Sequence, residues 1–120
     1  MLRIALDFDD TYTADPMLWR SFITLCQVSG HEVSIVTLRD AELDTIAIDQ
    51  EFHRRNVPIV YCDGRAKKEY TESLGLHFDI WIDDNPWGLF NGTSFNAEQL
   101  QEWRDNDTHR KGLKNAADGG

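Results

Sequence analysis

Three aspartates stand close together near the start of the chain, directly after a short apolar segment. Asp7, Asp9 and Asp10 follow the run 2–6, in which an arginine is the only charged residue. Carboxylates this close repel one another unless a cation lies among them, and hard divalent metals such as Mg²⁺ prefer oxygen ligands. In an extended segment Asp7 and Asp9 point to the same side. The spacing indicates a metal site or, alternatively, an acidic turn that caps a helix, because aspartate is also a good N-cap residue.

Other polar residues follow the remaining apolar segments of the chain. In chain order they are Thr37 after 33–36, Lys67 and Lys68 after 58–62, and Asp83 and Asp84 after 78–82. In an open parallel sheet, ligands bind outside the carboxyl ends of the strands. If these segments are strands of one such sheet, all of these side chains meet at one edge. That convergence favours a functional site over a set of unrelated turns and helix ends.

The elements that must position these residues alternate along the chain. Strands are expected over 2–6, 32–37, 58–62 and 78–82. The first helix is expected to begin at Pro16, with Asp15 as its N-cap, and to stop at Gly30. The second is expected over 41–55 with Asp40 as its N-cap, and the third over 66–74. The predicted apolar face of the first helix comprises Met17, Leu18, Phe22, Leu25 and Cys26, and that of the second comprises Leu43, Ile46, Ala47 and Phe52. The alternation of strand and helix predicts an α/β fold with a mainly parallel sheet of four strands and helices on both faces.

The end of the chain carries weaker signals. Residues 89–95 are predicted to form a loop, and a last helix is expected over about 97–104. From 105 to 120 the chain is polar and ends in glycines, which is typical of a tail. The sequence therefore predicts one domain over 1–104 and a polar C-terminal tail over 105–120.

Composition and charge limit the classes of partner and compartment. The net charge of −9 argues against a broad nucleic-acid or anionic membrane surface, which needs a basic face. It is compatible with one phosphorylated ligand held by a metal and one or two cations. Cys26 and Cys62 have neither a CxxC nor a zinc spacing, and are most simply free buried thiols. No apolar run reaches the ~18 residues of a membrane span, and Asp7 interrupts any signal-peptide core, so a cytoplasmic protein is expected.

Taken in order, the polar motifs resemble those of the haloacid dehalogenase superfamily, most of whose members are phosphatases. The segment 7–11, DFDDT, is similar to its DxDxT motif, Thr37 to its second motif and Lys67 or Lys68 to its third. Residues 82–86, IDDNP, resemble the fourth motif in its paired-acid form. Each motif alone is weak, but the ordered set covers 2–86. The resemblance implies a three-layer α/β/α, Rossmann-like domain.

The resemblance also implies a role for each residue. Asp7 would attack phosphorus and form an aspartyl-phosphate, while Asp9 would protonate the leaving oxygen and later activate water. Mg²⁺ would be held by Asp7, by the backbone carbonyl of Asp9, and by Asp83 and Asp84, with Asp84 the more direct ligand of the pair. Thr37 and a lysine would bind the phosphoryl oxygens. Lys67 is favoured over Lys68 because it lies nearer the start of its helix.

Two features narrow the expected activity. An acid at the Asp9 position favours phosphomonoester hydrolysis over dehalogenation, since an alkoxide is a poor leaving group. The gaps at which such enzymes insert a cap domain are filled here by one helix each, so a capless member is expected. An open site suits a large substrate, or a homo-oligomer in which a neighbouring subunit acts as the lid. The short paired-acid motif with its proline, residues 82–86, resembles that of deoxyribonucleotidases. This suggests a small phosphorylated substrate such as a nucleotide, or a phosphorylated polynucleotide end.

One alternative to this function remains at the level of the sequence. A non-catalytic phosphate- or metal-binding module could keep the same fold and the same acids. A receiver domain of two-component signalling also uses acids, a threonine and a lysine. However, it carries its phosphoacceptor on a middle strand and has no DxDxT motif after the first strand.

Overall fold

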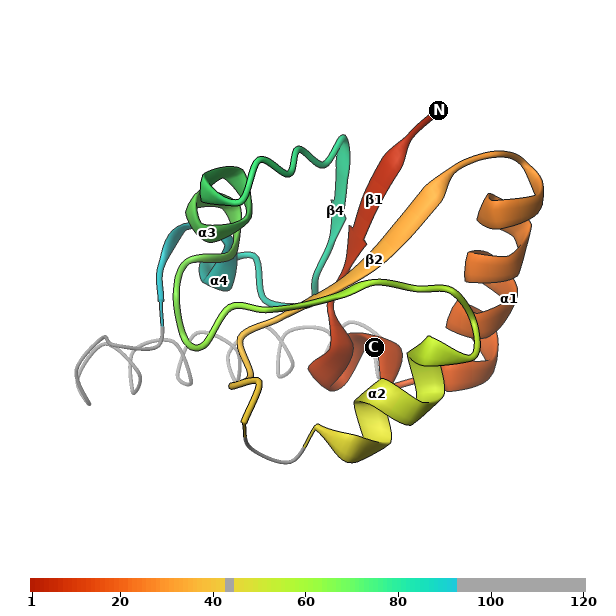
Figure 1. Cartoon of the computed structure of the whole chain (residues 1–120), viewed down its shortest axis with the longest axis horizontal. Helices are drawn as coiled ribbons and strands as arrows, with labels where there is room; N and C mark the ends of the chain where they lie inside the picture. Colours follow the sequence, from red (N-terminus) through yellow and green to blue (C-terminus); the bar gives the residue numbers. More distant parts are fainter. Residues whose placement is uncertain (43–44, 93–120) are drawn as a thin grey trace, which may run out of the picture.

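The computed structural model of the chain describes residues 1–42 and 45–92, and it consists of strands that alternate with helices (Figure 1). In chain order the elements are β1 (Arg3–Leu6), η1 (Phe8–Tyr12), α1 (Pro16–Val28), β2 (Glu32–Thr37), α2 (Ile46–His53), β3 (Ile59–Tyr61), α3 (Lys67–Ser73), β4 (Ile80–Ile82) and α4 (Trp87–Phe90). The predicted strand–helix alternation is confirmed. The expected helix over 97–104, the domain boundary at 104 and the tail over 105–120 lie outside the described residues.

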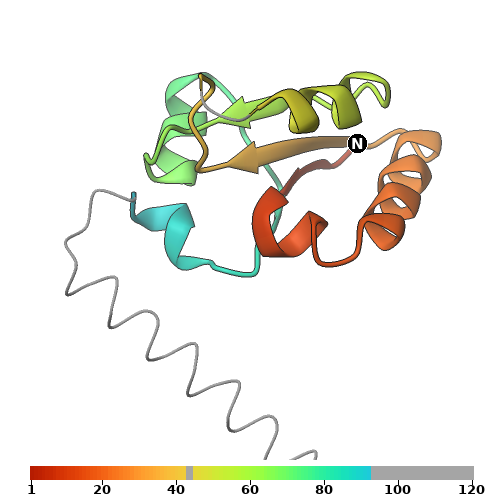
Figure 2. The same ribbon diagram turned by 90° about the horizontal axis from the view of Figure 1, so that it is seen from below.

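The four strands form one parallel sheet in the order β3-β2-β1-β4. Ile4 pairs with Val33 of β2 on one side and with Ile80 of β4 on the other, so β1 is a central strand. Because all strands run the same way, their carboxyl ends lie along one edge of the sheet, which Figure 2 views from below. Adjacent strands β1 and β4 both end at this edge in acidic residues.

The sheet is covered on both faces, as its apolar alternation requires. Ile4 and Leu6 of β1 belong to a core with Ile35, Ile23 of α1 and Phe52 of α2. Ala5, which lies between these two residues, points to the opposite face and belongs to a second cluster with Val36, Cys62 and Phe78. Tyr70 of α3 packs against this second cluster. The helices therefore divide as α1 and α2 on one face and α3 on the other, and the predicted three-layer α/β arrangement is confirmed (Figure 1). Within residues 1–42 and 45–92, no further domain is inserted between the strands.

Helices α1, α2 and α3 lie where three helices were predicted, but some details of these predictions were wrong. Asp15 caps α1 as predicted, by accepting a hydrogen bond from the amide of Leu18 at 3.2 Å. The buried residues of α1 are Ile23 and Cys26, whereas the predicted face members Met17, Leu18 and Leu25 are exposed. The reason is that the sheet touches only a narrow stripe of this helix, so part of its apolar surface faces outward.

The second helix starts later than the sequence suggested. It begins after Thr45, and Asp40 instead accepts a hydrogen bond from the Glu42 amide at 2.8 Å, which closes a local turn. Its buried residues are Ile48 and Phe52, while Ile46 is exposed. The predicted loop over 89–95 was also partly wrong, since residues 87–90 form α4.

Candidate metal and phosphate site

Asp7, the central residue of the candidate site, extends β1 beyond its last paired position. Its amide donates to the carbonyl of Ile82 at 2.9 Å, so Asp7 sits beside the end of β4. The chain then turns through η1, in which Asp10 adopts a left-handed conformation with φ of 63°. This turn brings Thr11 back against Asp7, and the Thr11 hydroxyl lies 3.1 Å from the Asp7 carboxylate.

The loop that carries these residues is anchored to the helices behind it. Tyr12 is buried and donates its hydroxyl to Glu51 of α2 at 2.5 Å. Arg20 of α1 binds the same carboxylate oxygen at 2.7 Å, and Arg55 binds it at 3.2 Å. Hydrogen bonds from Arg20 first and Tyr12 second outweigh burial and hold the pKa of Glu51 below its usual value. The turn after Asp7 is therefore fixed to the first face of the sheet.

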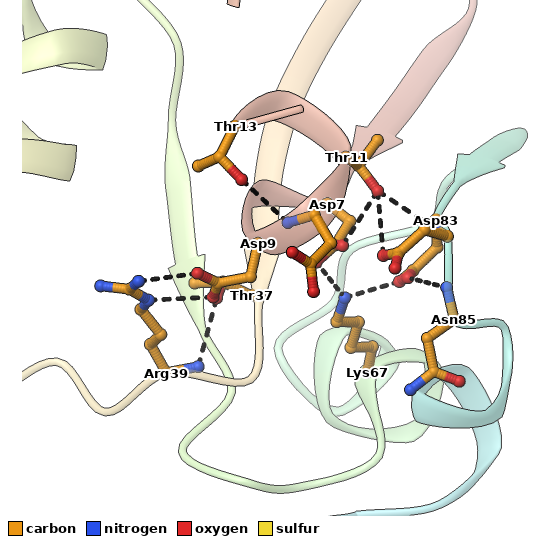
Figure 3. A network of polar contacts seen from close by, with 11 residues as sticks. Asp7, Asp9, Thr11, Thr13, Thr37, Arg39, Lys67, Asp83 and Asn85 are labelled. Atoms are coloured by element: carbon orange, nitrogen blue, oxygen red, sulfur yellow. Dashed lines mark hydrogen bonds and ion pairs between the residues drawn. The ribbon is translucent and has the colours of Figure 1, made fainter. Parts of the chain in front are cut away.

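Three carboxylates converge at the carboxyl edge of β1 and β4 (Figure 3). Asp7, Asp83 and Asp84 each offer an oxygen, and these oxygens lie within 4.8 Å of one another. The Thr11 hydroxyl is 3.1 Å from the carboxylates of both Asp7 and Asp84, and it accepts the Asp84 amide at 3.1 Å. A hydroxyl has only one proton, so it can donate to one of the two acids at a time. A cation between the acids would satisfy both, and the all-oxygen donor set suits Mg²⁺.

Lys67 is the buried cation of the site. Its side chain is 3% exposed, and its ammonium lies 2.8 Å from Asp7 and 2.6 Å from Asp83. It is the first residue of α3, which places it at the carboxyl edge of the sheet beside the acids. Lys68, the alternative considered from the sequence, is exposed and lies 5.9 Å from the ring centre of Phe90. The structure thus brings Lys67 to the acids and turns Lys68 away.

Burial sets the protonation behaviour of the pair. Burial raises the pKa of Asp7 to about 7, Lys67 opposes this shift, and the neighbouring Asp84 and Asp83 add to it. For Lys67, burial alone would lower the pKa, but the charges of Asp7 and Asp83 outweigh burial and raise it. Lys67 therefore stays protonated, while Asp7 is held in balance between its two forms near neutral pH in the metal-free protein.

Asp9 and Thr37 do not join this acidic cluster. Both carboxylate oxygens of Asp9 are bound by the guanidinium of Arg39, at 2.6 Å and 2.9 Å (Figure 3). Thr37 is 1% exposed, and its hydroxyl accepts the amide of Arg39 at 3.2 Å. Asp9 lines the cleft beside Asp7, whereas Thr37 is not among the described residues that line it.

The cleft itself is small and lies directly over the acids. Its volume is about 130 Å³, and besides the acids and Lys67 it is lined by Leu38, Asn85 and Gly88. The Asn85 amide donates to Asp83 at 2.9 Å, so both oxygens of Asp83 are engaged. No individual role was predicted from the sequence for Asn85, Thr11 or Arg39. Each had a signal in the sequence, because Thr11 and Asn85 lie within the motifs 7–11 and 82–86, and Arg39 follows Thr37 at the end of a predicted strand.

The fold and the cluster define a small α/β domain with a four-stranded parallel sheet and an acidic triad, Asp7, Asp83 and Asp84, that can hold a metal ion. Comparison with protein-family models, with curated proteins and with solved structures finds no significant match to this chain. No helix in the described part of the chain has the length and apolar character needed to cross a membrane.

Proposed function

We propose that the chain is a magnesium-dependent phosphomonoester hydrolase of the haloacid dehalogenase type. The observation that carries this proposal is the arrangement around Asp7, a buried carboxylate held by Lys67 at 2.8 Å within a cluster of two further acids. Phosphoryl transfer through a covalent intermediate uses a carboxylate nucleophile, a nearby cation and a group of metal ligands, and this arrangement offers all three.

In the proposed reaction a carboxylate oxygen of Asp7 attacks phosphorus, and the bond to the leaving oxygen breaks. Asp9 donates its proton to that oxygen, and then removes a proton from the water that hydrolyses the aspartyl-phosphate. Lys67 holds Asp7 in place and adds positive charge near the phosphoryl oxygens. A magnesium ion held by Asp7, Asp83 and Asp84 would reduce the repulsion between the nucleophile and the phosphate.

The small size of the cleft places little restriction on the leaving group of the substrate. About 130 Å³ is well below the ~300 Å³ from which ligand pockets usually start, so we infer that only the phosphoryl group enters. The leaving group then lies outside, which is compatible with a nucleotide or a phosphorylated polynucleotide end. Trp87 and Phe90 of α4 are exposed, close in sequence to the lining residue Gly88, and offer aromatic surface for such a group.

The test is hydrolysis of p-nitrophenyl phosphate with and without Mg²⁺, followed by a panel of nucleotides and end-phosphorylated oligonucleotides. Asp7→Asn should fold and lose turnover, because an amide cannot attack phosphorus. The matched control is Asp63→Asn, which removes one exposed acid at the same edge and places an asparagine at a left-handed position it tolerates. Near-normal turnover in Asp7→Asn would overturn the proposed mechanism.

One observation favours a second candidate, a non-catalytic phosphate- or metal-binding module. The acid proposed to protonate the leaving group, Asp9, has both oxygens engaged by Arg39. A protein that binds Mg²⁺ and inorganic phosphate but hydrolyses none of the panel would support this alternative.

A further inference from the structure

Asp9 lines the cleft, and Arg39, which binds it, is not among the described lining residues. The ion pair between them has no role in the chemistry described so far. Arg39 Nε lies 2.9 Å from one oxygen of Asp9, and a terminal nitrogen lies 2.6 Å from the other. Such a two-point contact leaves neither oxygen of Asp9 directed at a leaving group over Asp7 (Figure 3). The contact is therefore incompatible with the proposed part of Asp9 in the reaction.

The position of Arg39 is held independently of Asp9. Its amide donates to Thr37 at 3.2 Å, and its carbonyl accepts the amide of Asp63 at 3.2 Å. Its guanidinium carbon lies 5.3 Å from the ring centre of Phe8. The backbone is thus fixed at the end of β2, and the guanidinium rests against an aromatic face, so a small rotation of the side chain can change its anionic partner.

The ion pair between Arg39 and Asp9 is also accessible enough for another anion to replace Asp9. The side chains of Arg39 and Asp9 are 33% and 47% exposed, and ion pairs with this exposure contribute little to stability. An incoming anion can compete for the guanidinium. In contrast, Lys67 is buried and bound to two carboxylates, so it is not available to a second group outside the cleft.

We propose that Arg39 is a specificity-determining latch that selects phosphomonoesters carrying a second anionic group close to the phosphate. That group takes the guanidinium from Asp9, and the released Asp9 turns toward the leaving oxygen. The substrate thereby brings Asp9 into its catalytic position. A phosphomonoester without a second anion leaves Asp9 bound to Arg39. This inference rests on the proposed phosphatase, but its anion preference can be measured without turnover.

The binding test uses two phosphonates that the protein cannot hydrolyse, phenylphosphonate and 3-carboxyphenylphosphonate, titrated calorimetrically into the full chain with Mg²⁺. We expect the carboxylated probe to bind roughly tenfold tighter, the worth of one charge-assisted contact. Arg39→Gln should abolish the preference. Arg65→Gln, which removes the same charge from an exposed residue in the loop between β3 and α3, should keep it.

A second pair of variants separates a latch from general electrostatics. Asp9→Asn should increase the preference for the carboxylated probe, because it removes the Asp9 carboxylate that competes for Arg39. The increase should vanish in Asp9→Asn/Arg39→Gln. Asp10→Asn removes an equal charge from a residue that also lines the cleft. Equal increases in Asp9→Asn and Asp10→Asn, a preference that survives Arg39→Gln, or no binding of either probe would overturn the latch.

Turnover separates the latch from the proposed function. With phenyl phosphate and 3-carboxyphenyl phosphate, Arg39→Gln should lower kcat/KM for the carboxylated substrate and raise it for phenyl phosphate, because Asp9 is then no longer held by Arg39. Hydrolysis without this selectivity would overturn the latch and leave the phosphatase standing. An Arg39-dependent binding preference without hydrolysis of any phosphomonoester would overturn the phosphatase and leave the anion site standing.

Discussion

The two sides of the cleft hold their charges in opposite ways. On one side Lys67, Asp7 and Asp83 have side chains that are between 3% and 8% exposed. On the other, Arg39 and Asp9 are 33% and 47% exposed. Both sides contain a cation bound to acids at distances below 3 Å. The difference lies in solvent access, and it predicts which contacts are fixed and which can be exchanged.

Burial makes the Lys67 cluster strongly interdependent. Charges removed from water must be paired, and loss of one partner leaves the others uncompensated in a medium of low polarity. At the Asp9 pair, water replaces a lost partner at little cost. A rigid buried cluster suits the nucleophile that we propose, which must keep its position. An exposed pair suits the contact that we propose to change on substrate binding.

The largest effect is expected when the buried cation is removed. Lys67→Met leaves Asp7 and Asp83 facing each other without a cation, and should lower the free energy of unfolding by about 3–5 kcal/mol at pH 7. The measurement is urea unfolding in the absence of metal. Lys68→Met is the matched control and should change stability by less than about 0.5 kcal/mol, because Lys68 is exposed.

The next effect is the pH dependence of the metal-free protein. The pKa of Asp7 is raised by burial to about 7, so the folded state binds its proton more tightly than the unfolded state does. Stability should therefore fall as pH rises from about 4 to about 7, by at most about 4 kcal/mol, at 1.36 kcal/mol per unit of pKa. Urea unfolding at several pH values should show this fall in wild type and not in Asp7→Asn. An identical pH profile in the two proteins would contradict the buried-acid account.

Metal addition should reverse that trend. A cation that binds only the folded protein stabilises it by about 2.7 kcal/mol at a hundredfold excess over its dissociation constant, which raises the melting midpoint by several degrees. The Mg²⁺-induced shift should grow with pH through about 7, because Asp7 must lose its proton to bind metal. A chelator should reverse it, and Ca²⁺ should also bind but support little turnover.

The acidic triad makes this prediction specific. The shift should shrink sharply in Asp84→Ala and much less in Asp10→Ala, since Asp10 lines the cleft without joining the cluster. Equal shifts in wild type and Asp84→Ala would show that the paired acids are not the metal site.

The smallest effect on stability is expected on the exposed side of the cleft. Arg39→Gln should change the free energy of unfolding by at most about 1 kcal/mol, as for other exposed ion pairs. The difference in the loss of stability between Lys67→Met and Arg39→Gln tests most directly whether the buried cluster and the exposed pair differ as expected. Thermal unfolding of Arg39→Gln that matched the loss in Lys67→Met would show that the Asp9 pair is structural and not exchangeable.

Periodicity determined most of the fold because each element is short and has clear ends. The apolar run before Asp7 and the run before Asp83 are strands, and their parallel pairing follows from the helices between them. This placed both acidic motifs at one edge of the sheet. The start of α2 could not be obtained in this way, since Asp40 can cap either a helix or a turn and uses its carboxylate for a turn.

The sequence by itself determined which residue types reach the carboxyl edge, because strand direction and the order of the motifs are properties of the chain. Only the tertiary structure decided their partners. Lys67 and Lys68 are adjacent and chemically identical, but the orientation of α3 buries one among carboxylates and exposes the other. Likewise, the turn after β1 directs Asp7 toward Lys67 and Asp9 toward Arg39. Such choices depend on backbone geometry and burial, which couple residues far apart in the chain, and local patterns do not contain them.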